Sequence, residues 1–161
     1  MGNQIVDLVA MTVVAIEDAA ERSRLCDSIL RELPDWFGIE QATAAYVRDV
    51  ADLPTFKIGD DAFLSLKLHT PQAAEIYVMG VRPARHGQGL GTALVRHVEE
   101  YLGARDCQYL QVKTLGPSRP DEHYARTRHF YERCGFVPLE EIHGLWEGNP
   151  CLVLVKGLGC R

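Results

Sequence analysis

The fold of this chain is decided by one stretch, Val81-Arg82-Pro83-Ala84-Arg85-His86-Gly87-Gln88-Gly89-Leu90-Gly91-Thr92. The apolar run Ile76–Val81 predicts a central strand that enters a glycine-rich turn, and the apolar spacing of Leu90–Leu102 predicts a helix that begins inside that turn. Glycines allow backbone N–H groups to converge, and a helix N-terminus adds partial positive charge. The stretch therefore predicts a cradle for a phosphate or pyrophosphate, with a glycine-rich connection that binds nothing as the alternative.

Two well-known phosphate motifs do not fit the turn. A P-loop ends in Gly-Lys-Ser/Thr, whereas Gly91-Thr92-Ala93 has no lysine. The dinucleotide fingerprint G-x-G-x-x-G also fails, because Gly87-Gln88-Gly89-Leu90-Gly91 is spaced G-x-G-x-G. A nucleotide- or phosphate-ester-binding enzyme is therefore the weaker interpretation of this turn.

A second informative segment follows about 40 residues later, Tyr124-Ala125-Arg126-Thr127-Arg128-His129-Phe130-Tyr131-Glu132-Arg133-Cys134-Gly135-Phe136. With the glycine turn and a predicted strand between them, the two segments resemble the signatures of the GNAT superfamily of N-acetyltransferases. In the superfamily's Gln/Arg-x-x-Gly-x-Gly/Ala motif, Gly89 and Gly91 fall on the glycines, and His86 replaces the first residue.

The helical signature of the superfamily is Asn-x-x-Ala-x-x-Phe/Leu-Tyr-x-x-x-Gly-Phe. Tyr131, Gly135 and Phe136 match it, whereas Tyr124 and Thr127 stand in place of its Asn and Ala. The resemblance in the order of elements covers most of the chain, roughly from Ile5 to Val155.

The remaining pattern predicts an α/β fold and a single domain over residues 1–161. Strands are expected at Ile5–Val14, Thr55–Ile58, Ala62–His69, Ile76–Val81, Tyr109–Thr114 and Cys151–Val155, and helices at Glu17–Leu33, Gln41–Val50, Leu90–Leu102 and His123–Arg133. The alternation in Ala62–His69 predicts a half-buried strand with Leu64, Leu66 and Leu68 on one face. The resemblance implies a mixed, mostly antiparallel sheet, flanked by helices and splayed between its fourth and fifth strands.

The resemblance implies that acetyl-CoA is the co-substrate and that no metal is needed. Pantetheine would pair with the central strand and the pyrophosphate would lie on the turn. The implied contacts are Met79, Gly80, Val81, His86, Gly87, Gln88, Gly89, Leu90, Gly91 and Thr92. Arg85, Arg126 or Arg128 could meet the nucleotide phosphates, although exposed arginines on a helix are more often solvated.

The implied reaction moves an acetyl group to a primary amine by direct attack in a ternary complex. An alkyl amine with a pKa near ~10 is mostly protonated at pH 7, so a base must remove its proton. Glu75, in an Ala-Glu-Ile context 14 residues before Gly89, is the predicted base. A surface ion pair is the alternative for Glu75, and His69 and His143 are weaker candidates.

Two further demands of this chemistry concern charge on oxygen and on sulfur. A backbone N–H near Val78 or Met79 would stabilise the oxyanion of the tetrahedral intermediate. Tyr131 matches the superfamily's acid tyrosine and would protonate the leaving thiolate, with a half-buried aromatic side chain as the alternative.

The acceptor site is expected near three aromatic residues. Trp36 and Phe37 lie between the first two predicted helices, and Trp146 lies in the turn before the last predicted strand. Core or lid packing is an equal alternative for all three. Asp35 and Glu40 could steer a cationic acceptor.

Composition and charge limit the partners. The net charge of −5 is against nucleic-acid binding, and no stretch predicts a signal peptide or a membrane span. Residues 1–80 carry 13 acidic and 6 basic side chains, whereas residues 81–161 carry 9 acidic and 11 basic. The five cysteines show no C-x-x-C spacing, which favours a reducing, cytoplasmic location.

The expected partner is a small-molecule or peptide amine, and the resemblance adds a homodimer because dimers are common in the superfamily. The alternative function is a non-catalytic acyl-CoA-binding or sensor domain on the same fold. That alternative predicts acetyl-CoA binding without turnover of any amine, and the presence of both Glu75 and Tyr131 argues against it.

Overall fold

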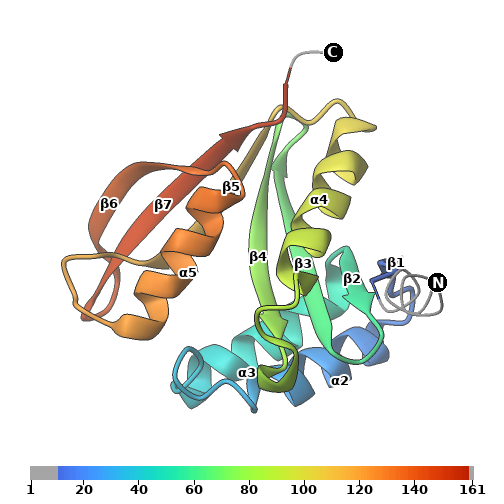
Figure 1. The fold of residues 1–161 in the computed structure, drawn as a ribbon, viewed down its shortest axis with the longest axis horizontal. Coiled ribbons are helices and arrows are strands. Elements are labelled where there is room, and N and C mark those ends of the chain that lie inside the picture. The colour runs from blue at the N-terminus through green and yellow to red at the C-terminus, as the bar shows by residue number, and fades with distance from the viewer. Residues whose placement is uncertain (1–10, 160–161) are drawn as a thin grey trace. The chain divides into compact units, whose positions relative to one another are not determined.

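The structure is a computed structural model that describes residues 11–159 (Figure 1). Within these residues, seven strands are hydrogen-bonded in the order β1-β2-β3-β4-β5-β7-β6. The strands are β1 Val14–Ala15, β2 Thr55–Ile58, β3 Ala62–Thr70, β4 Ala73–Val81, β5 Tyr109–Leu115, β6 Val137–Trp146 and β7 Asn149–Gly157. The helices are α2 Ala19–Leu30, α3 Glu40–Asp49, α4 Leu90–Gly103 and α5 Glu122–Arg133, with short 3-10 turns η1 Val50–Asp52 and η2 Pro83–Arg85.

The predicted mixed, mostly antiparallel sheet is confirmed. The strand pairs β1–β2, β2–β3, β5–β7 and β6–β7 are antiparallel, whereas β4 and β5 are parallel. The register between β4 and β5 runs from Ala73 opposite Tyr109 to Ile76 opposite Val112 and then ends. This short ladder is the predicted splay between the fourth and fifth strands of the superfamily fold.

The chain forms two compact units. Of the described residues, one unit contains those up to Lys67 together with Val78–Val98, and the other contains Leu68–Tyr77 together with those from Glu99 onward. Strands β3 and β4 contribute to both units. A single domain over residues 1–161 stays a prediction.

In the first unit, helix α2 is set by its cap and by its apolar stripe. The Asp18 carboxylate accepts a hydrogen bond from the Glu21 amide at 2.9 Å, which satisfies one of the unpaired amides of the first turn. Leu25, Cys26, Ile29 and Leu30 are buried along one face. Helix α2 also contacts α3, and the Ser23 hydroxyl donates to the Val47 carbonyl at 2.7 Å.

Gly80 shows how closely α2 packs on the sheet. A Cβ atom at Gly80 would lie 2.9 Å from Ile29 Cγ2, 3.2 Å from Leu33 Cδ1 and 3.3 Å from Phe63 Cε1. Protein interiors pack at crystal-like density, so a methyl group here needs the surrounding side chains to move. Packing therefore accounts for glycine at this position of β4.

In the second unit, α5 packs against β5 beside strands β7 and β6 (Figure 1). Asp121 caps the helix by accepting from the Tyr124 amide at 3.0 Å. Arg128 Nη1 donates to the Leu115 carbonyl at 2.8 Å and so ties α5 to β5. The helix ends at Arg133, and Gly135, two residues later, has a φ of +94° that favours glycine.

Several boundaries differ from prediction. The expected alternation in β3 is wrong, because Ala62–Leu66 are buried on both faces and Leu68 is 52% exposed. Trp146 ends β6 and precedes the turn, whereas it was expected within it. Most of the predicted first strand lies outside the described residues, which place strand at Val14–Ala15.

Across residues 11–159, no helix has the length and apolar character needed to cross a bilayer.

Candidate active site

The glycine turn has the geometry of an anion cradle. Strand β4 ends at Val81, η2 follows, and α4 begins at Leu90. Gly87 and Gly89 have φ of +73° and +85°, in the left-handed region that glycine adopts without strain. Among the described residues, no backbone carbonyl accepts a hydrogen bond from the amides of residues 87–92. These amides at the helix N-terminus are therefore suited to the oxygens of a pyrophosphate.

The three arginines that could meet the nucleotide phosphates are engaged by other groups. Arg85 Nη1 lies 2.6 Å from Asp61 Oδ2, and its Nε donates to Gln88 Oε1 at 2.8 Å. Arg126 contacts His123 Nδ1 at 2.9 Å, and Arg128 bonds the chain at Leu115. Arg85 thus braces the turn, and Asp61 balances its charge.

His86 links the turn to the loop that carries Trp36. Its Nε2 lies 2.7 Å from the Val81 carbonyl oxygen, which can only accept, so Nε2 carries the proton in this contact. The Trp36 ring meets the His86 ring edge on, with centroids 6.0 Å apart. The structure therefore brings together one predicted acceptor residue and one predicted CoA residue within the first unit.

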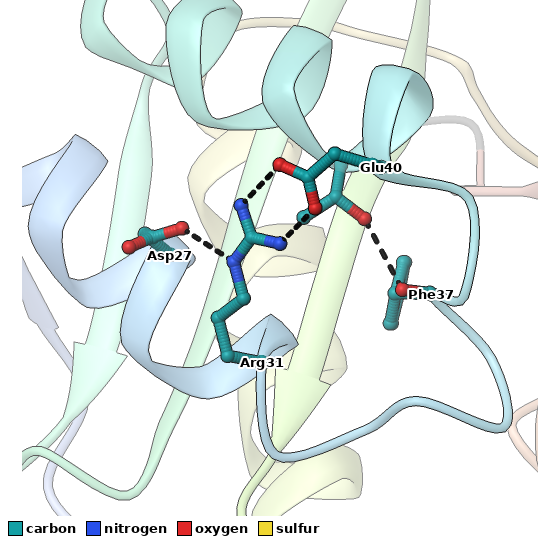
Figure 2. A network of polar contacts seen from close by, with 5 residues as sticks. Asp27, Arg31, Phe37 and Glu40 are labelled. Atoms are coloured by element: carbon teal, nitrogen blue, oxygen red, sulfur yellow. Dashed lines mark hydrogen bonds and ion pairs between the residues drawn. The ribbon is translucent and has the colours of Figure 1, made fainter.

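The loop between α2 and α3 is closed by an ion-pair network (Figure 2). Arg31 binds Asp27 Oδ1 through Nε at 3.0 Å and holds the carboxylate of Glu40 with both terminal nitrogens. The hydrogen bond from Arg31 lowers the pKa of Glu40. Because Arg31 balances the charge of Glu40, this carboxylate is a poor element for steering a cationic acceptor.

Phe37 is the second aromatic residue of this loop. Its carbonyl accepts from the Thr43 hydroxyl at 3.2 Å (Figure 2). Its ring meets the ring of Tyr46 edge on, with centroids 5.9 Å apart. Both Trp36 and Phe37 are half-buried. The loop is thus held at its backbone and keeps part of both rings accessible.

Glu75 lies in the second unit and is 6% exposed. Its Oε1 is 2.6 Å from His69 Nε2 on β3 and 3.0 Å from Lys113 Nζ on β5. The parallel register places Glu75 opposite Gln111, two residues before Lys113, so Glu75 and Lys113 share a face. Glu75 thus makes the ion pairs that the alternative expects, but its carboxylate is buried and does not lie on the surface.

Tyr131 is also in the second unit, on α5, and is 5% exposed. Its ring packs against Phe130 and Phe136, with centroids 5.2 and 5.6 Å away. The Tyr131 carbonyl accepts from the Phe136 amide at 3.0 Å where the helix ends. The three matching residues of the second signature therefore form one packed end of α5.

Trp146 and the other predicted residues fall as follows. Trp146 is half-buried in the second unit and lines an open hollow of about 550 Å³ at the β6–β7 turn. His143 is exposed in β6 and near Glu141. In the described part of the chain, no group of three or more His, Cys, Asp or Glu side chains could hold a metal.

Sequence reasoning missed Lys113. The residue reads as an ordinary polar position of β5, and its contact with Glu75 depends on the parallel register of two strands separated by α4. The only signal in the sequence is the spacing of Gln111 and Lys113, which puts both side chains on the same face of a strand. His69, a weaker candidate for the base, is a hydrogen-bond partner of Glu75 in the structure.

The profile of the Acetyltransferase (GNAT) family matches residues 23–136, which include the glycine turn, Glu75 and Tyr131. The chain belongs to this family. The predicted membership of a family of acetyltransferases is confirmed. A mycothiol acetyltransferase from Beutenbergia cavernae is 40% identical over 84 residues. That match spans 50% of this chain and 26% of the length of the relative.

Solved structures agree with the GNAT fold. A GNAT-family protein from Desulfovibrio desulfuricans superposes with a TM-score of 0.76 at 17% identity, covering 92% of this chain and 100% of its own. An aminoglycoside 6'-N-acetyltransferase complexed with coenzyme A superposes with a TM-score of 0.72 at 16% identity. This superposition covers 94% of this chain and 99% of the other chain. The ribosomal-protein-S18-alanine N-acetyltransferase from Escherichia coli superposes with a TM-score of 0.69 at 16% identity. This superposition covers 93% of this chain and 95% of the other chain.

Proposed function

We propose that this GNAT protein transfers the acetyl group of acetyl-CoA to a primary amine by direct attack in a ternary complex. The observation that carries the proposal is the Glu75 carboxylate, which is buried on β4 and takes two hydrogen bonds on one oxygen. A binding or sensor domain has no need for an oriented carboxylate there, so this geometry favours catalysis over the non-catalytic alternative.

The glycine turn would hold the co-substrate. Acetyl-CoA supplies an acetyl thioester as the electrophile. Its pyrophosphate would take hydrogen bonds from the amides of Gly87–Thr92, because two glycines with positive φ precede the N-terminus of α4. The backbone of Met79–Val81 would pair with pantetheine, and an amide near Val78 or Met79 would donate to the developing oxyanion.

Glu75 would act as the general base. An amine with a pKa near ~10 is mostly protonated at pH 7, and only the neutral form attacks a thioester. Glu75 would accept the proton from the amine, directly or through one water molecule. His69 and Lys113 both donate to Oε1 of this carboxylate, which supports a fixed orientation for the proton acceptor.

Tyr131 would protonate the leaving thiolate of CoA. A phenol with a pKa near ~10 donates to a thiolate whose thiol has a pKa near ~8.5 only slightly uphill, so placement governs the rate. The packing of Tyr131 between Phe130 and Phe136 supports a fixed position for its ring.

The acceptor would be a small-molecule or peptide amine that contacts Trp36, Phe37 or Trp146. Trp36 and Phe37 are half-buried on a loop fixed by Arg31, which suits a binding wall. The names of the similar proteins point to different acceptors, namely mycothiol chemistry, aminoglycosides and the alanine of a ribosomal protein. We therefore propose the chemical class and leave the individual amine to experiment.

An amine panel tests the proposal. The purified chain is incubated with acetyl-CoA and polyamines, amino acids, aminoglycosides, peptide N-termini, lysine peptides and the acceptor of the mycothiol enzyme, and release of CoA thiol is followed. Turnover with at least one amine is expected, and Glu75→Gln should reduce it most near pH 7, where neutral amine is scarce. Acetyl-CoA binding without turnover of any amine would favour the sensor alternative. Parallel pH profiles for the wild type and Glu75→Gln would remove Glu75 from the base role.

A further inference from the structure

Side chains from β3, β4 and β5 form a polar cluster at the Glu75 carboxylate, which itself lies on β4. His69 comes from β3 and Lys113 from β5, and both donate to the same oxygen, Oε1, at 2.6 and 3.0 Å. The side chains of His69 and Lys113 are 33% and 27% exposed, whereas that of Glu75 is 8% exposed. The carboxylate is therefore the inner member of the cluster, and its two donors lie closer to solvent.

The second carboxylate oxygen of Glu75, Oε2, is left open by this arrangement. In the part of the chain that the structure describes, both polar contacts of the Glu75 side chain go to Oε1. No solvent-inaccessible side-chain nitrogen or oxygen in that part lacks a hydrogen-bond partner. Since Oε2 has no such partner, it must reach solvent, and it can accept a proton from an amine or a water molecule.

A further titratable group near Glu75, beside these donors, is one thiol on β7. Burial raises the pKa of the Cys151 thiol. The positive charge of Lys113 lowers this pKa, and the negative charge of Glu75 raises it further. Cys151 is therefore neutral near pH 7, and the basic side chain beside the carboxylate is that of Lys113. Burial disfavours an ionised carboxylate unless an opposite charge lies within about 4–6 Å, and Lys113 Nζ satisfies that condition.

We propose that Lys113 and His69 are positioning residues for Glu75. The ammonium of Lys113 keeps the buried carboxylate ionised, and both donors hold Oε1 so that Oε2 faces the proton to be removed. This inference rests on the proposed role of Glu75 as the base. His69 on β3 and Lys113 on β5 would then set the pH range in which Glu75 can accept a proton.

The test is the pH dependence of kcat/KM for the full chain with acetyl-CoA and an accepted amine. In Lys113→Met the acid limb of the profile should move to higher pH, so that kcat/KM falls about tenfold near pH 6.5 and recovers at alkaline pH. Lys113→Gln keeps a donor without the charge and should show the same shift, and it serves if the Met variant does not fold. Lys113→Arg should retain the wild-type acid limb because it retains the charge.

His69 is tested in the same way. His69→Gln keeps a donor for Oε1 and should remain near the wild-type kcat, whereas His69→Ala should lower kcat several-fold with little change in acetyl-CoA affinity. Lys67→Met is the matched control, because it removes a lysine charge from β3. It should leave the profile unchanged.

The outcomes separate this inference from the function on which it rests. If Glu75→Gln keeps the wild-type kcat/KM, the base assignment fails, and the inference fails with it. If Glu75→Gln is slow but folded Lys113→Met and Lys113→Gln keep the wild-type pH profile, the base stands and the positioning role is overturned. A shifted acid limb with unchanged acetyl-CoA affinity supports the positioning role.

Discussion

The rings of Trp36 and His86 meet edge on, with centroids 6.0 Å apart and planes at 86°. His86 in turn donates through Nε2 to the Val81 carbonyl at 2.7 Å. One imidazole therefore connects the end of β4, the glycine turn and the aromatic loop between α2 and α3. This link gives the proposed acceptor loop a direct contact with the proposed pyrophosphate turn.

Replacing His86 should weaken acetyl-CoA binding. His86→Ala removes the hydrogen bond to Val81 and the ring contact with Trp36, and one hydrogen bond contributes about 0.5–1.5 kcal/mol. We expect the Kd for acetyl-CoA, measured by calorimetry, to rise about 2- to 10-fold. His86→Gln can keep a donor and should lose less. Equal affinity of His86→Ala and the wild type would contradict the bracing role of this histidine.

Tyr131→Phe should slow turnover strongly while leaving acetyl-CoA affinity within a few-fold. The change removes only the hydroxyl, so the packing against Phe130 and Phe136 is retained. A general acid typically contributes about 10²–10⁴-fold to the rate. Steady-state kinetics and calorimetry measure the two effects, with Phe130→Leu as a control for packing. An unchanged kcat would remove Tyr131 from the mechanism.

Gly89→Ala should reduce acetyl-CoA affinity by about tenfold. Gly89 has φ +85°, and a left-handed conformation costs other residues roughly 1–2 kcal/mol, where 1.4 kcal/mol is a tenfold change. Gly148→Ala is the matched control, because Gly148 has φ +71° in the turn between β6 and β7. That variant carries comparable backbone strain, and it should bind acetyl-CoA normally. Equal effects of the two variants on binding would indicate general destabilisation.

Gly80→Ala should lower the free energy of unfolding by about 1–3 kcal/mol, which is typical of overpacking. The new methyl group would lie 2.9 Å from Ile29 Cγ2. Gly157→Ala on β7 is the control, because nothing lies within 4 Å of a Cβ there. Urea denaturation of both variants measures the difference. If Gly80→Ala were as stable as Gly157→Ala, the side chains around Gly80 could make room for a methyl group with no loss of stability, which would contradict the prediction.

Arg31→Met should raise the pKa of Glu40 toward the ordinary value of 4.5, because the hydrogen bond from Arg31 holds it lower. In the wild type, a depressed folded-state pKa means that this contact stabilises the fold above pH 4.5 and is lost as pH falls through the lower value. Carboxyl carbon chemical shifts titrated by NMR measure both proteins. Arg48→Met, at an exposed pair with Asp49, should leave Glu40 unchanged.

Prediction from sequence worked where local signals agree with the tertiary context. Thr55–Ile58 is a strand with the predicted bounds, because turn residues mark both of its ends. Prediction failed at Leu68, because the alternation of apolar and polar residues in β3 predicts that this side chain is buried. The strand is instead buried on both faces up to Leu66 and exposed beyond it. Period alone cannot register such a change along one strand.

The site shows the same division. The motif glycines and Tyr131 are local signals within one helix or turn, and they led to the cradle and to the packed end of α5. Lys113 contacts Glu75 only because β4 and β5 run parallel with Ala73 opposite Tyr109. Such a register is set by the whole unit, so no single stretch of sequence predicts the contact.

The position of β7 between β5 and β6 bears on how this protein is made. Tyr109–Leu115 pairs along its length with Cys151–Gly157, so β5 must wait for roughly 40 further residues before its ladder with β7 can form. At a synthesis rate of about 5–20 residues per second, the nascent chain carries this unpaired edge for about 2–8 s. A ribosome-bound chain therefore exposes β5 to chaperones until β7 has emerged, and slower translation of residues 116–148 would lengthen that exposure.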